Sequence, residues 1–125
     1  MNELLRQAER TLAMGRLDEA EGLFQRALDQ DPRSAIAALG LARVAGERGD
    51  EAGAYRLAGR AVHLDPANGA AVALVVRLRE ILAGRGEQVE LPPALRGRDR
   101  APSSGKGSYG SRPGLLRRLL GRRDG

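Results

Sequence analysis

The sequence repeats itself at a fixed interval, and this interval constrains the fold more than any other feature. The stretch ALDQDPRS ends at Ser34, and the similar stretch AVHLDPAN ends at Asn68. Aligned without a gap, residues 1–34 and 35–68 share nine identities, among them Gly15/Gly49, Ala20/Ala54 and Pro32/Pro66. Because Gly and Pro fix turns and Ala fixes close packing, the register indicates two copies of one structural unit.

Each unit has the pattern of two helices. Leu4, Ala8 and Leu12 recur at four-residue intervals, which is typical of one face of a helix. Gly15 then favours a left-handed helix stop. A second apolar helix face follows, formed by Ala20, Leu23, Phe24, Ala27 and Leu28. Asp31-Pro32 is expected to end this helix, and Ser34 and Asn68 are expected to N-cap the helices that follow them.

The segment GRLDEAEGLFQRALDQDPRS, residues 15–34, closely resembles the second half of the tetratricopeptide repeat motif. The matching residues are Gly15, Leu17, Ala20, Phe24, Ala27 and Pro32. The interval between the two units is also the period of that family. The resemblance implies an all-α fold, a short α-solenoid of two helix-turn-helix repeats, 1–34 and 35–68, with a capping helix at 69–83.

The second repeat departs from the first at positions that matter for packing. Glu51 stands where the first repeat has Leu17, and Ala58 replaces Phe24. Gly46, Gly53 and Gly59 each weaken a helix by about 0.5–1 kcal/mol relative to Ala. We therefore expect a thin core, which a partner helix or self-association would help to cover.

The resemblance further implies that the first helix of each repeat lines a concave groove that holds a peptide or helix of a partner protein. Transferred to this sequence, the groove residues are Leu5, Arg6, Glu9, Leu12, Ile36, Leu39, Arg43, Glu47, Ala73, Leu74 and Arg77, with Ala13 and Ile81 beside them. An aliphatic floor flanked by Arg and Glu favours a short amphipathic segment. The alternative is that these charges belong to solvated helix faces with i,i+4 pairing.

Some members of the family hold a carboxylate with a clamp of Lys, Asn and Arg. The matching positions in this sequence are Leu5, Glu9 and Gly40, so we do not expect that mode of binding.

The sequence offers no constellation for catalysis, so we predict no enzyme, no cofactor, no metal and no small-molecule substrate. Cysteine is absent, which excludes disulfides and thiol chemistry. The one histidine, His63, is predicted to be a surface residue near a helix end. The stretch GKGSYG, residues 105–110, matches G-x-G-x-x-G but lies between APSS and SRPG, without the strand and helix that a dinucleotide site needs.

Charge divides the chain into two parts. Residues 1–83 hold 11 Arg against 12 acidic residues, whereas residues 84–125 hold 10 Lys and Arg against 4 acidic residues. Residues 84–112 are rich in Gly, Pro, Ser and Arg and are expected to form a disordered linker. Residues 113–125 are expected to form a basic amphipathic tail helix. Its docking residues would be Leu115, Leu116, Arg117, Arg118, Leu119 and Leu120.

The tail leaves its target open. Its composition suits four targets, namely an anionic membrane surface, an acidic groove on a partner, the groove of another copy and nucleic-acid phosphates. The alternative is that the tail is an Arg-rich disordered end without a dedicated target.

We accordingly expect a cytoplasmic adaptor or scaffold, free or at the periphery of a membrane, that binds a protein segment in its groove and docks through its tail. The alternative is a membrane-surface or nucleic-acid accessory that acts through the tail, with the repeats serving for self-association.

Overall fold

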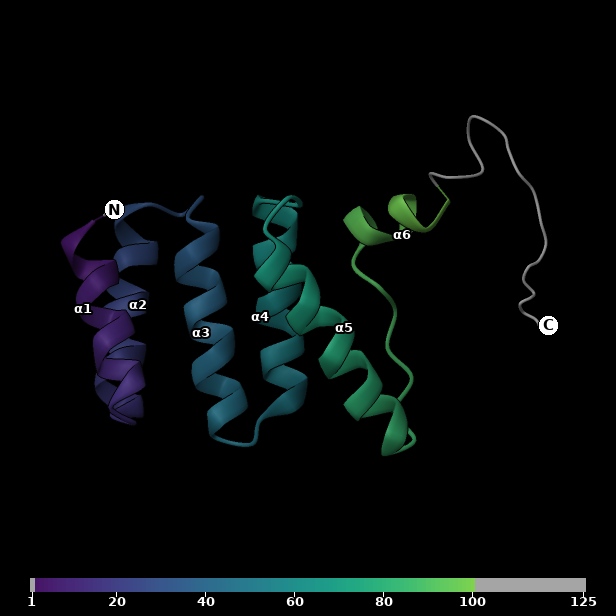
Figure 1. The fold of residues 1–125 in the computed structure, drawn as a ribbon, viewed down its shortest axis with the longest axis horizontal. Helices are drawn as coiled ribbons and strands as arrows, with labels where there is room; N and C mark the ends of the chain where they lie inside the picture. Colours follow the sequence, from purple (N-terminus) through teal and green to yellow (C-terminus); the bar gives the residue numbers. More distant parts are fainter. Residues whose placement is uncertain (1, 101–125) are drawn as a thin grey trace. The chain divides into compact units, whose positions relative to one another are not determined.

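The computed structural model describes residues 2–100, and every regular element in that range is a helix (Figure 1). The helices are α1 (Glu3–Ala13), α2 (Leu17–Gln30), α3 (Ala35–Glu47), α4 (Glu51–Leu64), α5 (Gly69–Gly84) and α6 (Pro93–Arg100). The chain up to Pro92 forms one compact unit, and α6 belongs to a second. Two helix pairs followed by a fifth helix confirm the predicted α-solenoid fold.

The turns and caps between the helices are the ones that the repeat predicts. Gly15 and Gly49 follow α1 and α3 with φ angles of +78° and +83°, a backbone conformation that side chains other than Gly rarely adopt. The side chain of Ser34 accepts a hydrogen bond from the backbone nitrogen of Ala37 at 3.1 Å. The side chain of Asn68 accepts one from Ala71 at 3.0 Å. Each cap satisfies a backbone donor that the first turn of a helix leaves unpaired.

The first repeat packs against the start of the second around one large aromatic side chain. Phe24 is fully buried in a cluster drawn from α1, α2 and α3. Its ring lies against Gly40 of α3 so closely that a Cβ atom placed on Gly40 would stand 2.3 Å from the ring. The absence of a side chain at residue 40 is therefore what allows α3 to approach α2.

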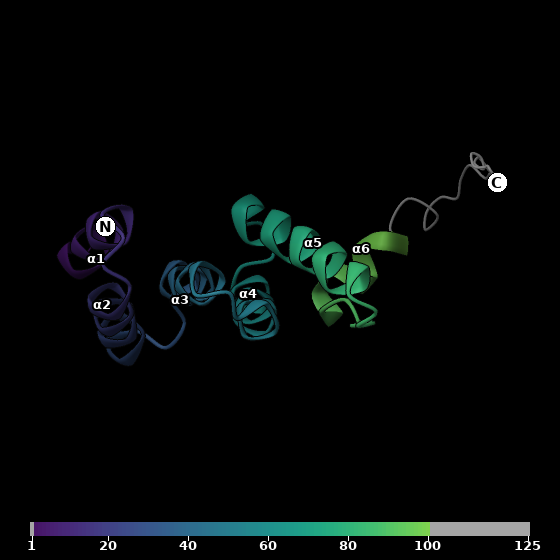
Figure 2. The same ribbon diagram turned by 90° about the horizontal axis from the view of Figure 1, so that it is seen from below.

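The buried side chains of α4 and α5 include no aromatic residue. Among them are Ala54, Ala58, Ala61, Val62, Ala71 and Val75, together with Leu78 and Leu82. Here α5 packs on α4. Figure 2 shows α1 and α5 on one side of the stack and α2 and α4 on the other, with α3 set between them.

Exposed ion pairs connect the turns of neighbouring helix pairs. Arg48, which follows α3, pairs with Asp18 and with Glu21 at 2.8 Å, both on α2. Hydrogen bonds to Glu21 and Asp18 raise the pKa of Arg48 above its ordinary value. Arg85, which follows α5, pairs in the same manner with Glu51 at the start of α4.

An extended segment, residues 87–92, follows α5 and turns back toward α4. The Nε of Arg79 donates to the carbonyl oxygen of Val89 at 3.2 Å, and the Tyr55 hydroxyl donates to the carbonyl oxygen of Glu90. Pro92 lies close to Gly59 of α4.

The course of this segment differs from the sequence-based expectation of a disordered linker that starts at residue 84. The helix before it also runs one residue further than the predicted end at residue 83. The physical reason is local, because side chains of α4 and α5 bind the backbone carbonyls of the segment and so hold it in place. Residues 101–112 of the predicted linker lie outside the described residues. The boundaries proposed for the linker and the tail stay predictions.

The approach of Phe24 to Gly40 generates a test of the fold. Gly40→Ala should lower the free energy of unfolding by about 1–3 kcal/mol, because the new methyl group overlaps a fully buried ring. Urea denaturation of the full chain followed by circular dichroism measures this change.

Gly22→Ala is the matched control, because a Cβ atom at Gly22 on α2 meets nothing within 4 Å. It should raise the free energy of unfolding by about 0.5–1 kcal/mol through helix propensity alone. Equal effects of the two substitutions would contradict the packing described for Phe24.

Candidate partner-binding groove

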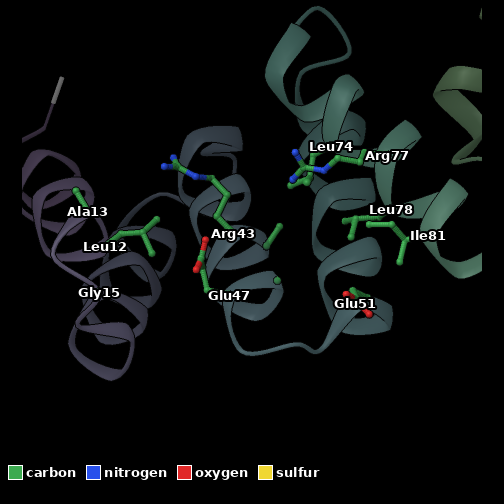
Figure 3. Close-up of a pocket in the computed structure, with 12 residues that line it drawn as sticks. Leu12, Ala13, Gly15, Arg43, Glu47, Glu51, Leu74, Arg77, Leu78 and Ile81 are labelled. Carbon is green, nitrogen blue, oxygen red and sulfur yellow. The ribbon is translucent and has the colours of Figure 1, made fainter.

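One hollow on this module, hereafter the central groove, lies between α1, α3 and α5. It is a cavity of about 510 Å³ lined by Leu12, Ala13, Gly15, Ala42, Arg43, Gly46, Glu47, Glu51, Leu74, Arg77, Leu78 and Ile81. Figure 3 shows Leu12 and Ala13 on one wall, Arg43 and Glu47 in the middle, and Leu74, Arg77 and Ile81 on the opposite wall. Aliphatic side chains and both signs of charge therefore face the same space.

A second cavity, hereafter the arginine pocket, lies beside the central groove between α3 and α5. It measures about 360 Å³ and is lined by Leu39, Arg43, Ala70, Ala73, Leu74 and Arg77. Arg43, Leu74 and Arg77 line both cavities, so the two are adjacent. The lining of the arginine pocket is aliphatic apart from its two guanidinium groups, and it includes no acidic side chain.

Two of the four charged groups of the central groove are paired within the protein. Arg43 donates from Nη1 to the carboxylate of Glu9 on α1 at 3.0 Å. Glu51 pairs with Arg85. The side chains of Glu47 and Arg77 take part in no ion pair within residues 2–100. The groove thus carries one unpaired acid and one unpaired base.

Most of the residues predicted for the groove lie at one of the two cavities. Leu12, Glu47, Arg43, Leu74 and Arg77 line the central groove, and Leu39 and Ala73 line the arginine pocket. Ala13 and Ile81, which the sequence placed beside this set, also line the central groove.

The remaining four predicted groove residues, Leu5, Arg6, Glu9 and Ile36, line neither cavity. Leu5 is buried in the core, because it faces α2 and α3. Arg6 is exposed and pairs with Glu3 at 2.7 Å. Glu9 reaches the groove only through its bond to Arg43. Ile36 is 39% exposed.

Six lining residues were not predicted for the groove, namely Gly15, Ala42, Gly46, Glu51, Ala70 and Leu78. Ala42, Ala70 and Leu78 continue the three- and four-residue spacing of predicted neighbours, so that spacing was the signal that would have found them. Gly46 forms part of the floor without a side chain. Glu51 begins α4, the second helix of its repeat. The prediction considered only the first helix of each repeat and therefore did not include it.

The described residues hold no arrangement typical of metal binding or of a membrane span. No group of three or more His, Asp or Glu side chains within them could hold a metal ion. None of the helices that the structure describes has the length and apolar character needed to cross a membrane. His63 is exposed near the end of α4, as predicted.

Two further predictions concern residues beyond the described range. The stretch GKGSYG at 105–110 and the tail residues 113–125 lie outside the described residues.

Comparison with known proteins bears on the helix pairs. A family model described as a tetratricopeptide repeat matches residues 11–78, which is more than half of the chain. The matched range contains α2, α3 and α4 and the lining residues of both cavities except Ile81. A search of curated proteins found no match.

The ion pairs on α1 generate a pH-dependent prediction. The hydrogen bond and the charge of Arg6, with a smaller contribution from Arg10, hold the pKa of Glu3 below its ordinary value of 4.5. A lowered pKa means that the ionised carboxylate stabilises the fold above pH 4.5, and this contribution is lost as the pH falls through the folded-state pKa. An NMR titration of the Glu3 carboxyl carbon measures the shift.

Arg6→Gln should return the pKa of Glu3 most of the way to its ordinary value. Arg10→Gln is the matched variant, and it should change the pKa less, because Arg10 stands 3.6 Å from Glu3 and Arg6 stands 2.7 Å from it. An equal response to both variants would contradict the geometry of α1.

Proposed function

Because the chain belongs to the tetratricopeptide repeat family, whose repeats generally mediate protein–protein interactions and form non-catalytic scaffolds, we propose that it is an adaptor. In this proposal the central groove holds an amphipathic segment of a partner protein, either an extended peptide or a helix. The observation that carries the proposal is the lining of the groove, where Leu12, Leu74 and Ile81 surround two charges that have no partner in residues 2–100.

The aliphatic side chains of this lining favour contact with a protein segment over contact with water. Ile81 is 38% exposed, and Leu74 is half-buried. Covering such aliphatic surface contributes about 25 cal/mol per Å². An amphipathic segment would add charges opposite to Glu47 and Arg77, and these charges would fix its register in the groove. Hydrophobic contact would then supply affinity, and the charges would supply specificity.

We also propose that residues 113–125 dock the complex on a second surface. The support is the sequence, in which the leucines 115, 116, 119 and 120 alternate with Arg117 and Arg118. A short basic amphipathic helix binds anionic surfaces by combining apolar burial with charge attraction. The groove would select the partner, and the tail would select the place.

Substitution of one groove residue tests the adaptor proposal. A photoreactive amino acid at Ile81 of the full chain should crosslink to a partner in the native cell, and mass spectrometry then maps the crosslinked segment. A synthetic peptide of that segment should bind the purified full chain. Ile81→Asp should weaken this binding about tenfold or more, because it removes an aliphatic contact and introduces a carboxylate into an apolar wall.

Val76 provides the matched control. It lies on the same helix, it is 45% exposed, and it does not line the central groove. Val76→Asp should leave the affinity for the peptide unchanged, and a photoreactive group at residue 76 should not capture the same segment. Equal loss of binding in both variants would refute binding in the central groove.

The tail proposal is tested by vesicle co-sedimentation of the full chain. The protein should bind vesicles that contain anionic lipid and release them as salt is raised. Leu116→Asp with Leu119→Asp should abolish binding, because both the apolar contact and part of the net positive charge are lost. If the full chain instead binds duplex DNA and only Arg117→Gln with Arg118→Gln weakens it, phosphate contact replaces docking by the apolar face.

A further inference from the structure

We propose that the arginine pocket recognises an acidic residue of the partner segment, placed next to an aliphatic residue that enters the same pocket. This inference rests on the proposed function and adds the chemistry and the register of the ligand. It draws on three observations, namely the lining of the pocket, the position of Arg77 in the repeat and the bond between Arg43 and Glu9.

The lining of the arginine pocket selects for a carboxylate. Arg43 and Arg77 are its only charged lining residues, and Leu39, Ala70, Ala73 and Leu74 supply the rest. Two guanidinium groups that border an apolar space without a lining acid create a positive potential there. An acidic side chain satisfies this potential, and guanidinium groups bind carboxylates with a matched planar geometry. A basic residue at the same place would be repelled.

The repeat explains why one guanidinium is left without a partner. Glu9, Arg43 and Arg77 are spaced at the repeat interval, so they occupy one position in three successive units. The first two form an ion pair across α1 and α3. Arg77 on α5 has no neighbouring acid at the equivalent position, and within residues 2–100 it makes no ion pair. A ligand carboxylate would pair with Arg77 as Glu9 pairs with Arg43.

The bond between Arg43 and Glu9 makes the pocket adjustable. The hydrogen bond to Glu9 occupies Nη1 of Arg43, and the other guanidinium nitrogens remain available to a ligand. Glu9 is exposed and competes with any incoming carboxylate for the same cation. Removing the charge of Glu9 should therefore strengthen the binding of an acidic ligand, whereas removing the charge of Arg77 should weaken it. Opposite responses of this kind distinguish charge recognition from a loss of structure.

The experiment uses two capped probe peptides that differ in one residue. The peptides are acetyl-ALEALLA-amide and acetyl-ALQALLA-amide, and each is titrated into the ¹⁵N-labelled full chain. Chemical shifts of the backbone amides of α3 and α5 and of the arginine Nε–H groups report the site and the affinity. The Glu peptide should bind at the arginine pocket roughly threefold more tightly than the Gln peptide, as a partly exposed ion pair allows.

Three single substitutions complete the test. Arg77→Gln should abolish the preference for Glu over Gln, and Glu9→Gln should increase it. Arg26→Gln is the matched control, because Arg26 is an exposed arginine of α2 that lines neither cavity, and it should leave the preference unchanged.

Equal affinity for both peptides at the same residues would overturn the inference and leave the adaptor proposal standing. The absence of localised shifts with either peptide would also overturn it. Inorganic phosphate forms the last arm of the experiment. If phosphate alone shifts the same groups as strongly as the Glu peptide does, the pocket recognises free anions, and the inference about a peptide residue fails.

Discussion

The contact between the ring of Phe24 and the backbone of Gly40 sets how the helices stack. A buried aromatic ring fills the space beside a residue that has no side chain, so α3 lies close to α2. Between α4 and α5 the small and the large residue change places. One repeat interval later, Ala58 takes the position of Phe24, and Leu74 takes the position of Gly40. Leu74 is half-buried and lines both cavities. The same repeat position thus closes the packing between α2 and α3 and, on α5, borders both cavities.

The turns and the first core could be predicted from the sequence because each depends on a local rule. Gly15, Ser34 and Asn68 act through their own backbone and the next turn, so their residue type suffices. The burial of Phe24 follows from helix periodicity. The contact between Gly40 and the ring of Phe24 depends on the distance between α2 and α3, and sequence periodicity does not predict that distance.

Only part of the lining of the two cavities could be predicted, because the repeat gives the position of a residue along the chain and does not give the rotation of each helix. Arg43 and Arg77 follow from the repeat, and both line the cavities. Leu5 was assigned to the groove but lies in the core, because one helix position changes direction by about 100° from the next and the sequence does not fix the rotation of α1. Glu51 and residues 87–92 depend on contacts between distant residues, such as the hydrogen bond from Tyr55 to Glu90. Composition alone favours disorder for such a segment.

The course of residues 87–92 has a consequence for assembly. Val89 and Glu90 are bound by side chains of α5 and α4, and Pro92 lies beside α4. The segment therefore occupies the flank on which the second helix of a third repeat would stack. A head-to-tail polymer needs two complementary ends, and here one end is already covered. Stacking of a further helix on this flank would therefore require the segment to move away from α4 and α5.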